Sequence, residues 1–226
     1  MFAAEAEGLR ALREAGVRVP EVHSTGLSRN EAFIELERLD LAGPADWPAL
    51  ARMLAALHRH TGPRFGWETD NWIGLSPQKN AWSEDWVGFY RDYRLLPQLS
   101  KANLVEAAQR LLDNLDIFFE NHAPAPSLLH GDLWRGNVGF TRAGPVIFDP
   151  AAYYGDREAD LAMTELFGGF PRAFYEAYEA ELPLSPGYPA RKTLYNLYHL
   201  LNHLNLFGGG YRAQVDAALG LLLRSL

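Results

Sequence analysis

The sequence predicts an α+β fold in which a small N-terminal part carries one helix and two strands and a larger C-terminal part is mostly helical. A segment rich in Ala, Glu, Leu and Arg at 2–15 is typical of a helix and ends at Gly16. Two strand-like runs follow at 21–26 and 31–38, joined by a short polar turn. Near the C-terminus, segments separated by Pro and Gly are predicted as helices, at about 158–167, 171–180, 189–206 and 211–225.

The middle of the chain is expected to alternate helices with irregular structure. Asp46 can cap a helix that carries a proline in its first turn and runs to about His60. Residues 61–82 are rich in Gly, Pro and Trp and show no clear period, which predicts a long ordered loop. Two further helices are expected, one capped by Ser83 that runs to about Leu96 and one strongly amphipathic over 103–121.

Composition excludes several classes of protein. The hydrophobic fraction of 48% and charged fraction of 22% are ordinary for a globular chain, and 226 residues suffice to bury a core. The net charge of −7 argues against a general nucleic-acid binder, which would show a basic face. The absence of cysteine excludes disulfides and thiolate metal sites. Without a long apolar run or a signal peptide, we expect no membrane association and a cytoplasmic location.

The most informative segment is the loop His130–Asn137, which reads HGDLWRGN and is followed by a short apolar strand that ends at Asp149. Asp132 and Asn137 have the separation found in a kinase catalytic loop. In that chemistry one carboxylate accepts the proton of the acceptor hydroxyl, while an amide oxygen and a second carboxylate bind Mg²⁺. Asp132 is therefore the candidate catalytic base, and Asn137 and Asp149 are the candidate Mg²⁺ ligands. A surface hairpin with ordinary turn residues is the opposing interpretation.

This pattern gives the α+β prediction a protein-kinase-like form. Residues 1–40 would be a truncated N-lobe and hinge, and residues 41–226 a helical C-lobe with the catalytic loop. A Gly-rich phosphate loop and an early strand lysine, which a kinase carries before this loop, are missing, since the three lysines lie later in the chain, at 79, 101 and 192.

Several segments together closely resemble the fructosamine kinase (ketosamine 3-kinase) family, within the aminoglycoside phosphotransferase-like branch of kinase folds. They are the HGDLWRGN loop, Asp149–Ala151, Tyr153–Gly155, Phe167–Pro171 and Asn80–Trp86. The resemblance covers essentially all 226 residues. It implies phosphorylation of a sugar hydroxyl on ketosamines, the adducts of sugars with small or protein-bound amines, with ATP and Mg²⁺ as cofactors.

The resemblance also implies roles for individual residues. Asp132 would be the base, with Asn137 and Asp149 as Mg²⁺ ligands. Glu5 would be the helix glutamate that pairs with the nucleotide-binding lysine. The hinge at 35–39, including Glu37 and Leu39, would meet the adenine through its backbone. Asp160 resembles a residue that anchors the catalytic loop from a later helix.

The chain departs from the family at its beginning, because family members have a strand, a glycine-containing turn and a lysine strand before the helix that here begins at Phe2. The two strands at 21–38 would then lack sheet neighbours and expose an edge that favours pairing with another chain, as in a homodimer. Three explanations stay open: the sequence is a shortened form of an active enzyme, it is a natural degenerate kinase, or a second copy completes the sheet.

Two other functions stay open beside the ketosamine kinase. One is a kinase-like binding protein that holds a sugar adduct without transferring phosphate. The other is a phosphotransferase acting on an aminoglycoside or a choline-type alcohol with the same machinery.

Possible substrate contacts have simpler structural alternatives. Trp86, together with Trp67, Trp72 and Trp82, would form an aromatic platform or would pin the long loop to the core. Asp85 would contact a polar substrate or would favour the first turn of a helix. Trp134 would stack beside the substrate or pack under the loop. His199 and His203 have the i, i+4 spacing of zinc ligands, but without a further ligand they are interpreted as satisfied helix histidines.

Overall fold

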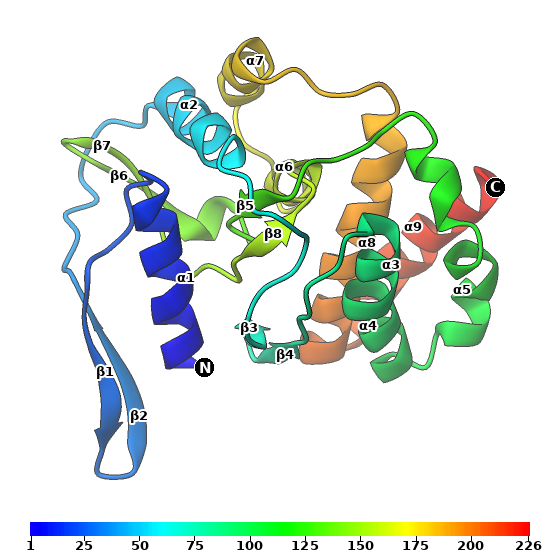
Figure 1. The fold of residues 1–226 in the computed structure, drawn as a ribbon, viewed down its shortest axis with the longest axis horizontal. Coiled ribbons are helices and arrows are strands. Elements are labelled where there is room, and N and C mark those ends of the chain that lie inside the picture. The colour runs from blue at the N-terminus through cyan, green and yellow to red at the C-terminus, as the bar shows by residue number, and fades with distance from the viewer.

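The computed structural model describes residues 1–226 and confirms the α+β architecture (Figure 1). The helices are α1 (Phe2–Glu14), α2 (Trp47–His58), α3 (Trp86–Tyr90), α4 (Leu96–Lys101), α5 (Val105–Leu112), α6 (Glu158–Leu166), α7 (Arg172–Glu181), α8 (Tyr188–Phe207) and α9 (Arg212–Arg224). The strands are β1 (Val22–Ser28), β2 (Glu31–Leu36), β3 (Asn71–Ile73), β4 (Ser76–Gln78), β5 (Ser127–Leu129), β6 (Val138–Thr141), β7 (Gly144–Ile147) and β8 (Tyr153–Gly155).

The N-terminal part consists of α1 and the β1–β2 hairpin, which extends away from the body in Figure 1. Leu9 and Leu12 of α1 are buried, as the helix pattern predicts. The hairpin is a sheet of only two strands, and Leu27 on β1 is 76% exposed. The expectation that these strands lack sheet neighbours is therefore confirmed, while pairing of this edge with a second copy stays a prediction.

Helix α1 packs closely on the segment that follows the predicted metal ligand Asp149, against the side chains of Pro150 and Ala152. Gly8 makes this approach possible, because a Cβ added there would lie 3.3 Å from side-chain carbons of both Pro150 and Ala152. The close contact brings Glu5, one turn earlier on the same helix, toward Asp149. The fold thus places the N-terminal helix in close contact with the segment that follows Asp149.

Short antiparallel pairs hold the catalytic segment inside the helical part. Strand β5 pairs with β8 and leads into the loop, and β6 pairs with β7 and leads out of it toward Asp149. The long helix α8 packs against α4, α6 and α9 and lies within the right-hand half of Figure 1. None of the helices combines the length and the apolar character that a membrane span requires.

The predicted helix of residues 46–60 is confirmed, with the Asp46 carboxylate accepting a hydrogen bond from the Ala49 N–H at 2.9 Å. The cap expected at Ser83 is wrong, because the Ser83 hydroxyl bonds to the backbone of Asp85 and the Asp85 carboxylate caps α3 instead. A π-helical turn at Arg91–Leu95 then separates α3 from α4. The wider π-helical turn comes just before Pro97, which has no N–H to donate to an α-helical hydrogen bond.

The single helix expected over 103–121 is also wrong. It ends at Leu112 and continues as a 3-10 turn at Leu115–Phe119. Asn114 between them leaves helical geometry and donates its side-chain amide to the Arg110 carbonyl at 2.8 Å, which offers the backbone an alternative to the helix. The segment 61–82 is an ordered connection as predicted, but it contains the unpredicted β3–β4 hairpin, whose strands are too short to show a period.

Candidate active site

The loop His130–Asn137 is held in place by the buried carboxylate of Asp160 on α6. Asp160 accepts hydrogen bonds from the backbone N–H groups of His130 and Gly131, both at 2.8 Å, and its Oδ2 lies 3.2 Å from His58 Nε2. Burial opposes ionisation of this group, yet the His58 contact and the backbone donors hold the pKa of Asp160 below its usual value. The anchoring role expected for Asp160 is thus present in the geometry.

His130 joins the loop to the strand that ends at Asp149. Its imidazole is fully buried, with Nε2 3.0 Å from the Phe148 carbonyl and Nδ1 accepting from the Asp132 N–H at 3.3 Å. Burial lowers the pKa of His130, so the ring is neutral and can serve both bonds. Gly131 has a φ of +83° and faces the Ala151 carbonyl so closely that any side chain would collide with it.

The two predicted metal ligands, Asn137 and Asp149, lie close to each other, one at the end of the loop and the other after β7. Asn137 donates its amide nitrogen to the carbonyls of Asp132 (2.9 Å) and Asp149 (3.4 Å), which leaves the amide oxygen of Asn137 without an internal donor. Asp149 has a left-handed φ of +59°, is exposed, and its carboxylate has no ion pair within the chain. An amide oxygen and a free carboxylate are the donor set that Mg²⁺ prefers.

Asp132, the predicted base, has a side chain that is only 16% exposed. Burial raises the pKa of Asp132 to about 7, and the negative charges of Asp149 and Asp160 add to the effect. The pKa of Glu5 is raised as well, first by burial and then by the negative charge of Asp149. A cavity of about 240 Å³ lies between Glu5 and Asp149. No lysine or arginine pairs with these carboxylates, so the site has room and charge for a divalent cation.

The predicted hinge connects β2 to α2. The Glu37 carboxylate binds Arg18 at 2.6 and 2.8 Å and accepts from the Glu21 N–H, and the Arg18 bond lowers the pKa of Glu37 to about 2. The Glu37 carboxylate is therefore already occupied by bonds within the chain. Leu39 is half-buried, and its backbone N–H and C=O have no hydrogen bond within the chain. Any contact of this segment with a nucleotide base would therefore come from the backbone near Leu39.

Of the three predicted substrate contacts, the structure places only Trp134 in the catalytic loop. The Asp85 carboxylate caps α3 through the N–H groups of Val87 and Gly88. Trp86 is 3% exposed and donates its indole N–H to Tyr195 at 3.0 Å, as a core residue does. Asp85 is exposed as well but its carboxylate is occupied by the cap, whereas Trp134 is 39% exposed and offers a free aromatic surface.

An aromatic surface next to Trp134 was not predicted as a unit. The Trp134 ring lies edge-on to Phe167, whose centroid is 4.5 Å from that of His203. Phe207 and Tyr211 extend the cluster through His203. Phe167 and His203 are far apart in the chain, so periodicity alone gives no sign that they meet. His199 on α8, interpreted from sequence as a satisfied helix residue, instead has an unpartnered Nδ1 that lies 4.0 Å from Asp132 Oδ1.

Comparison with known proteins agrees with this geometry. The family pattern described as fructosamine kinase matches residues 1–225. The chain belongs to the fructosamine kinase family. It is thus a phosphotransferase with an alcohol group as acceptor.

Individual relatives lead to the same family. A protein named as a probable ketoamine kinase of Synechocystis is 47% identical over 99% of this chain and 79% of its own length. The chloroplastic protein-ribulosamine 3-kinase of Arabidopsis thaliana is 43% identical over all of this chain and 73% of its own. The crystal structure of an assigned fructosamine-3-kinase from Haemophilus somnus superposes with a TM-score of 0.91 at 32% identity, covering 99% of this chain and 79% of that one. An aminoglycoside phosphotransferase, at 17% identity and a TM-score of 0.61, shares the fold.

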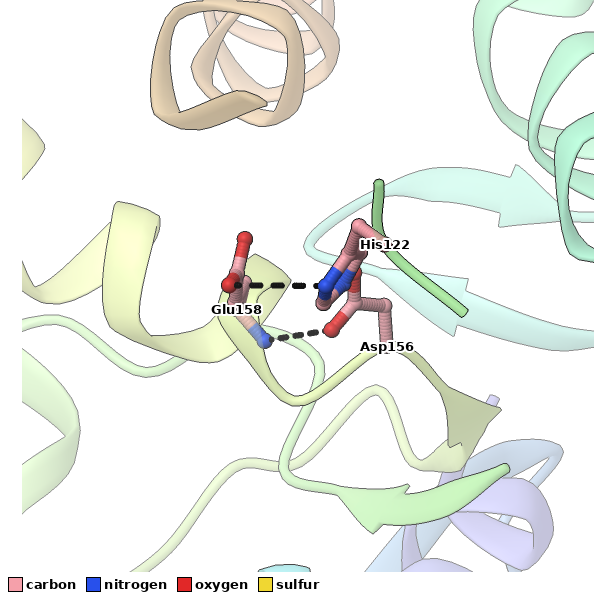
Figure 2. A group of neighbouring side chains, drawn as sticks. All are labelled: His122, Asp156 and Glu158. Atoms are coloured by element: carbon pink, nitrogen blue, oxygen red, sulfur yellow. Dashed lines mark hydrogen bonds and ion pairs between the residues drawn. The ribbon is translucent and has the colours of Figure 1, made fainter. Parts of the chain in front are cut away.

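A second group of possible metal ligands lies outside the catalytic loop of this fructosamine kinase family member (Figure 2). His122, Asp156 and Glu158 point toward one another, with His122 Nε2 2.6 Å from Asp156 Oδ2. Arg191, however, donates to both Glu158 oxygens at 2.7 and 3.1 Å, and Tyr195 donates to Asp156. The carboxylates are already satisfied by protein donors, so the group is a buried charge network and we do not assign it a metal.

The raised pKa of Asp132 predicts the pH dependence of the family reaction in this chain. Only the ionised carboxylate can accept a proton, so the rate is expected to rise about tenfold per pH unit below pH 7 and to level off above it. A divalent cation at Asp149 would remove one of the repelling charges and shift the midpoint to lower pH. Profiles of kcat/KM at low and high Mg²⁺ measure both effects, and a profile that is flat through neutral pH contradicts the assignment.

Proposed function

We propose that this chain transfers the γ-phosphoryl group of ATP to a sugar hydroxyl of a ketosamine, free or protein-bound, with Mg²⁺ as cofactor. The observation that carries the proposal is Asp132, a nearly buried carboxylate with a raised pKa in a loop that also carries Asn137 and lies beside Asp149. The names of the relatives, ketoamine kinase and ribulosamine 3-kinase, indicate the acceptor class.

In this proposal the residues of the chain bind, orient and move one proton. The oxygen of the acceptor hydroxyl forms a bond to the γ-phosphorus, the bond from that phosphorus to the leaving oxygen of ADP breaks, and the hydroxyl proton goes to Asp132. Asn137 and Asp149 would hold Mg²⁺, which neutralises charge on the phosphates. Leu39 would meet the adenine through its backbone, and Glu5 would face the phosphate side of the cavity beside Asp149.

The aromatic cluster beside the loop suits a sugar adduct. Trp134 offers an exposed face two residues after the proposed base, and Phe167, which itself packs against His203, lies at its edge. Aromatic faces pack against the C–H surfaces of sugars while leaving hydroxyls free for hydrogen bonding. We place the sugar of the ketosamine against Trp134, with one hydroxyl directed toward Asp132.

The test is an ATP-consumption assay on the 226-residue chain with a fructosyl or ribulosyl amine, analysed by mass spectrometry for the phosphorylated product. The proposal expects a Mg²⁺-dependent product with ketosamines and none with the parent amines. Product formed only with an aminoglycoside or with choline would reassign the acceptor. Ketosamine binding by calorimetry without any transfer would favour the kinase-like binding protein, in which Glu5 has no cationic partner.

A further inference from the structure

His199 on α8 carries a buried polar atom that the chain itself does not satisfy. The side chain is 5% exposed, and Nδ1 is one of only four buried side-chain polar atoms without a hydrogen-bond partner. A buried polar atom that stays unpaired destabilises the fold, and native proteins rarely keep one without a reason. Its position next to the catalytic base is the reason that we pursue.

The unpaired Nδ1 lies 4.0 Å from Asp132 Oδ1. This separation is too long for a direct hydrogen bond, but an oxygen atom about 2.8 Å from each partner fits between them, with an angle of about 90° at that oxygen. The His199–Asp132 gap is therefore suited to a hydroxyl or a water that accepts from the ring and donates to the carboxylate.

The surroundings of the imidazole keep it neutral. Burial and the nearby His203 lower the pKa of His199 to about 3, so the ring is uncharged at any working pH. The His203 Nδ1 bonds to the His199 carbonyl at 2.9 Å, and the two rings therefore do not offer a shared pair of Nδ1 ligands to a metal. The sequence-based interpretation holds for His203 Nδ1 but is wrong for His199.

We propose that His199 is a positioning residue that donates its Nδ1–H to the oxygen of the acceptor hydroxyl. This rests on the proposed function, since it names the partner of the hydroxyl that is phosphorylated. The hydroxyl proton then points to Asp132 and leaves to it, while the remaining lone pair of the oxygen is free to attack the γ-phosphorus. His199 keeps its own proton throughout and undergoes no net change.

Two substitutions separate this role from simple packing. His199→Asn retains an N–H near the position of Nδ1, whereas His199→Phe keeps a ring of similar size and removes the donor. We expect His199→Phe to lower kcat/KM by about tenfold to a hundredfold, mainly through kcat, and His199→Asn to stay within about fivefold of the native chain. His199→Phe should unfold at the same or a higher temperature, because it removes an unpaired polar atom.

A purely structural histidine predicts the opposite pattern. The smaller asparagine would then be the more damaging change, and loss of rate would follow loss of thermal stability. Native kinetics in His199→Phe, or equal loss in both variants, would overturn the inference while leaving the kinase proposal intact.

A second measurement does not depend on turnover. Nitrogen-15 NMR of histidine-labelled chain reports which ring nitrogen of His199 carries the proton. The inference expects the proton on Nδ1, and a shift of that signal when a fructosyl amine is added but not when its 3-deoxy analogue is added. A proton on Nε2 overturns the inference whether or not phosphate is transferred. If the wild-type chain transfers no phosphate, the kinase proposal fails and this tautomer still decides the role of His199.

Discussion

Asp132→Asn is expected to abolish phosphoryl transfer and, above neutral pH, to make the protein more stable. The amide cannot accept the proton of the acceptor hydroxyl, and loss of a positioned base typically costs 10²–10⁴-fold in rate, so we expect a fall of about a thousandfold. Rate assays at saturating ATP measure it. The exposed control Asp216→Asn, which alters only a surface pair with Arg212, should keep the native rate.

The gain in stability follows from the sign of the pKa shift. Asp132 has a pKa of about 7 in the folded protein against 3.8 for an unperturbed aspartate, so the folded state holds more protons between these values. The free energy of unfolding contributed by this group therefore falls as pH rises from about 4 to 7. At pH near 8 the asparagine variant should be more stable by about 1–3 kcal/mol, and near pH 4 by almost nothing.

Urea unfolding of both proteins at the two pH values tests this result. An asparagine variant that is less stable than the native chain at the higher pH would show that the Asp132 carboxylate is not strained in the fold. Loss of rate together with loss of structure would show that the residue supports folding rather than catalysis.

Arg191→Met is expected to give the largest loss of stability among the changes considered, about 3–5 kcal/mol. The guanidinium is 2% exposed and the Glu158 side chain 0%, so removal of the arginine leaves a buried carboxylate without its cation. It also removes donors from the carbonyls of Phe118 and Pro186, at 3.2 and 3.0 Å. Denaturant unfolding measures the loss.

The double variant Arg191→Met with Glu158→Gln provides the control for this pair. It removes the stranded charge, so it should recover a large part of the loss, whereas an exposed pair such as Arg172 with Glu176 should contribute less than about 1 kcal/mol. A single variant with native stability would contradict the description of this network as buried and charge-compensated.

The sequence predicted well where a local rule determines the structure. The cap at Asp46 and the loop from His130 to Asn137 depend on neighbours in the chain, and both are as expected. The prediction failed at Ser83 because two residues only two positions apart, Ser83 and Asp85, can each cap this helix, and the carboxylate of Asp85 does so. Over 103–121 the periodic pattern continues past the end of the helix, because the Asn114 side chain donates to the Arg110 carbonyl.

The candidate base Asp132 was predictable from the sequence and its surroundings were not. Asp132 belongs to a contiguous motif, whereas its neighbour His199 comes from a helix more than sixty residues later, and only tertiary packing brings them together. The same holds for the aromatic cluster that joins Trp134 with His203 through Phe167. Spacing along a helix shows which residues share a face, but it does not show which loop that face meets.

The close contact at Gly8 influences the width of the cavity that Glu5 and Asp149 line. Because the Gly8 backbone lies against side-chain carbons of Pro150 and Ala152, the size of residue 8 influences the distance between Glu5 and Asp149. An alanine at position 8 would move the helix and the segment that follows Asp149 apart by a few tenths of an ångström. The cavity would widen, while every residue that lines it would stay the same. A substitution at a position outside the cavity can thus change the distance between the N-terminal helix and Asp149, the proposed Mg²⁺ ligand.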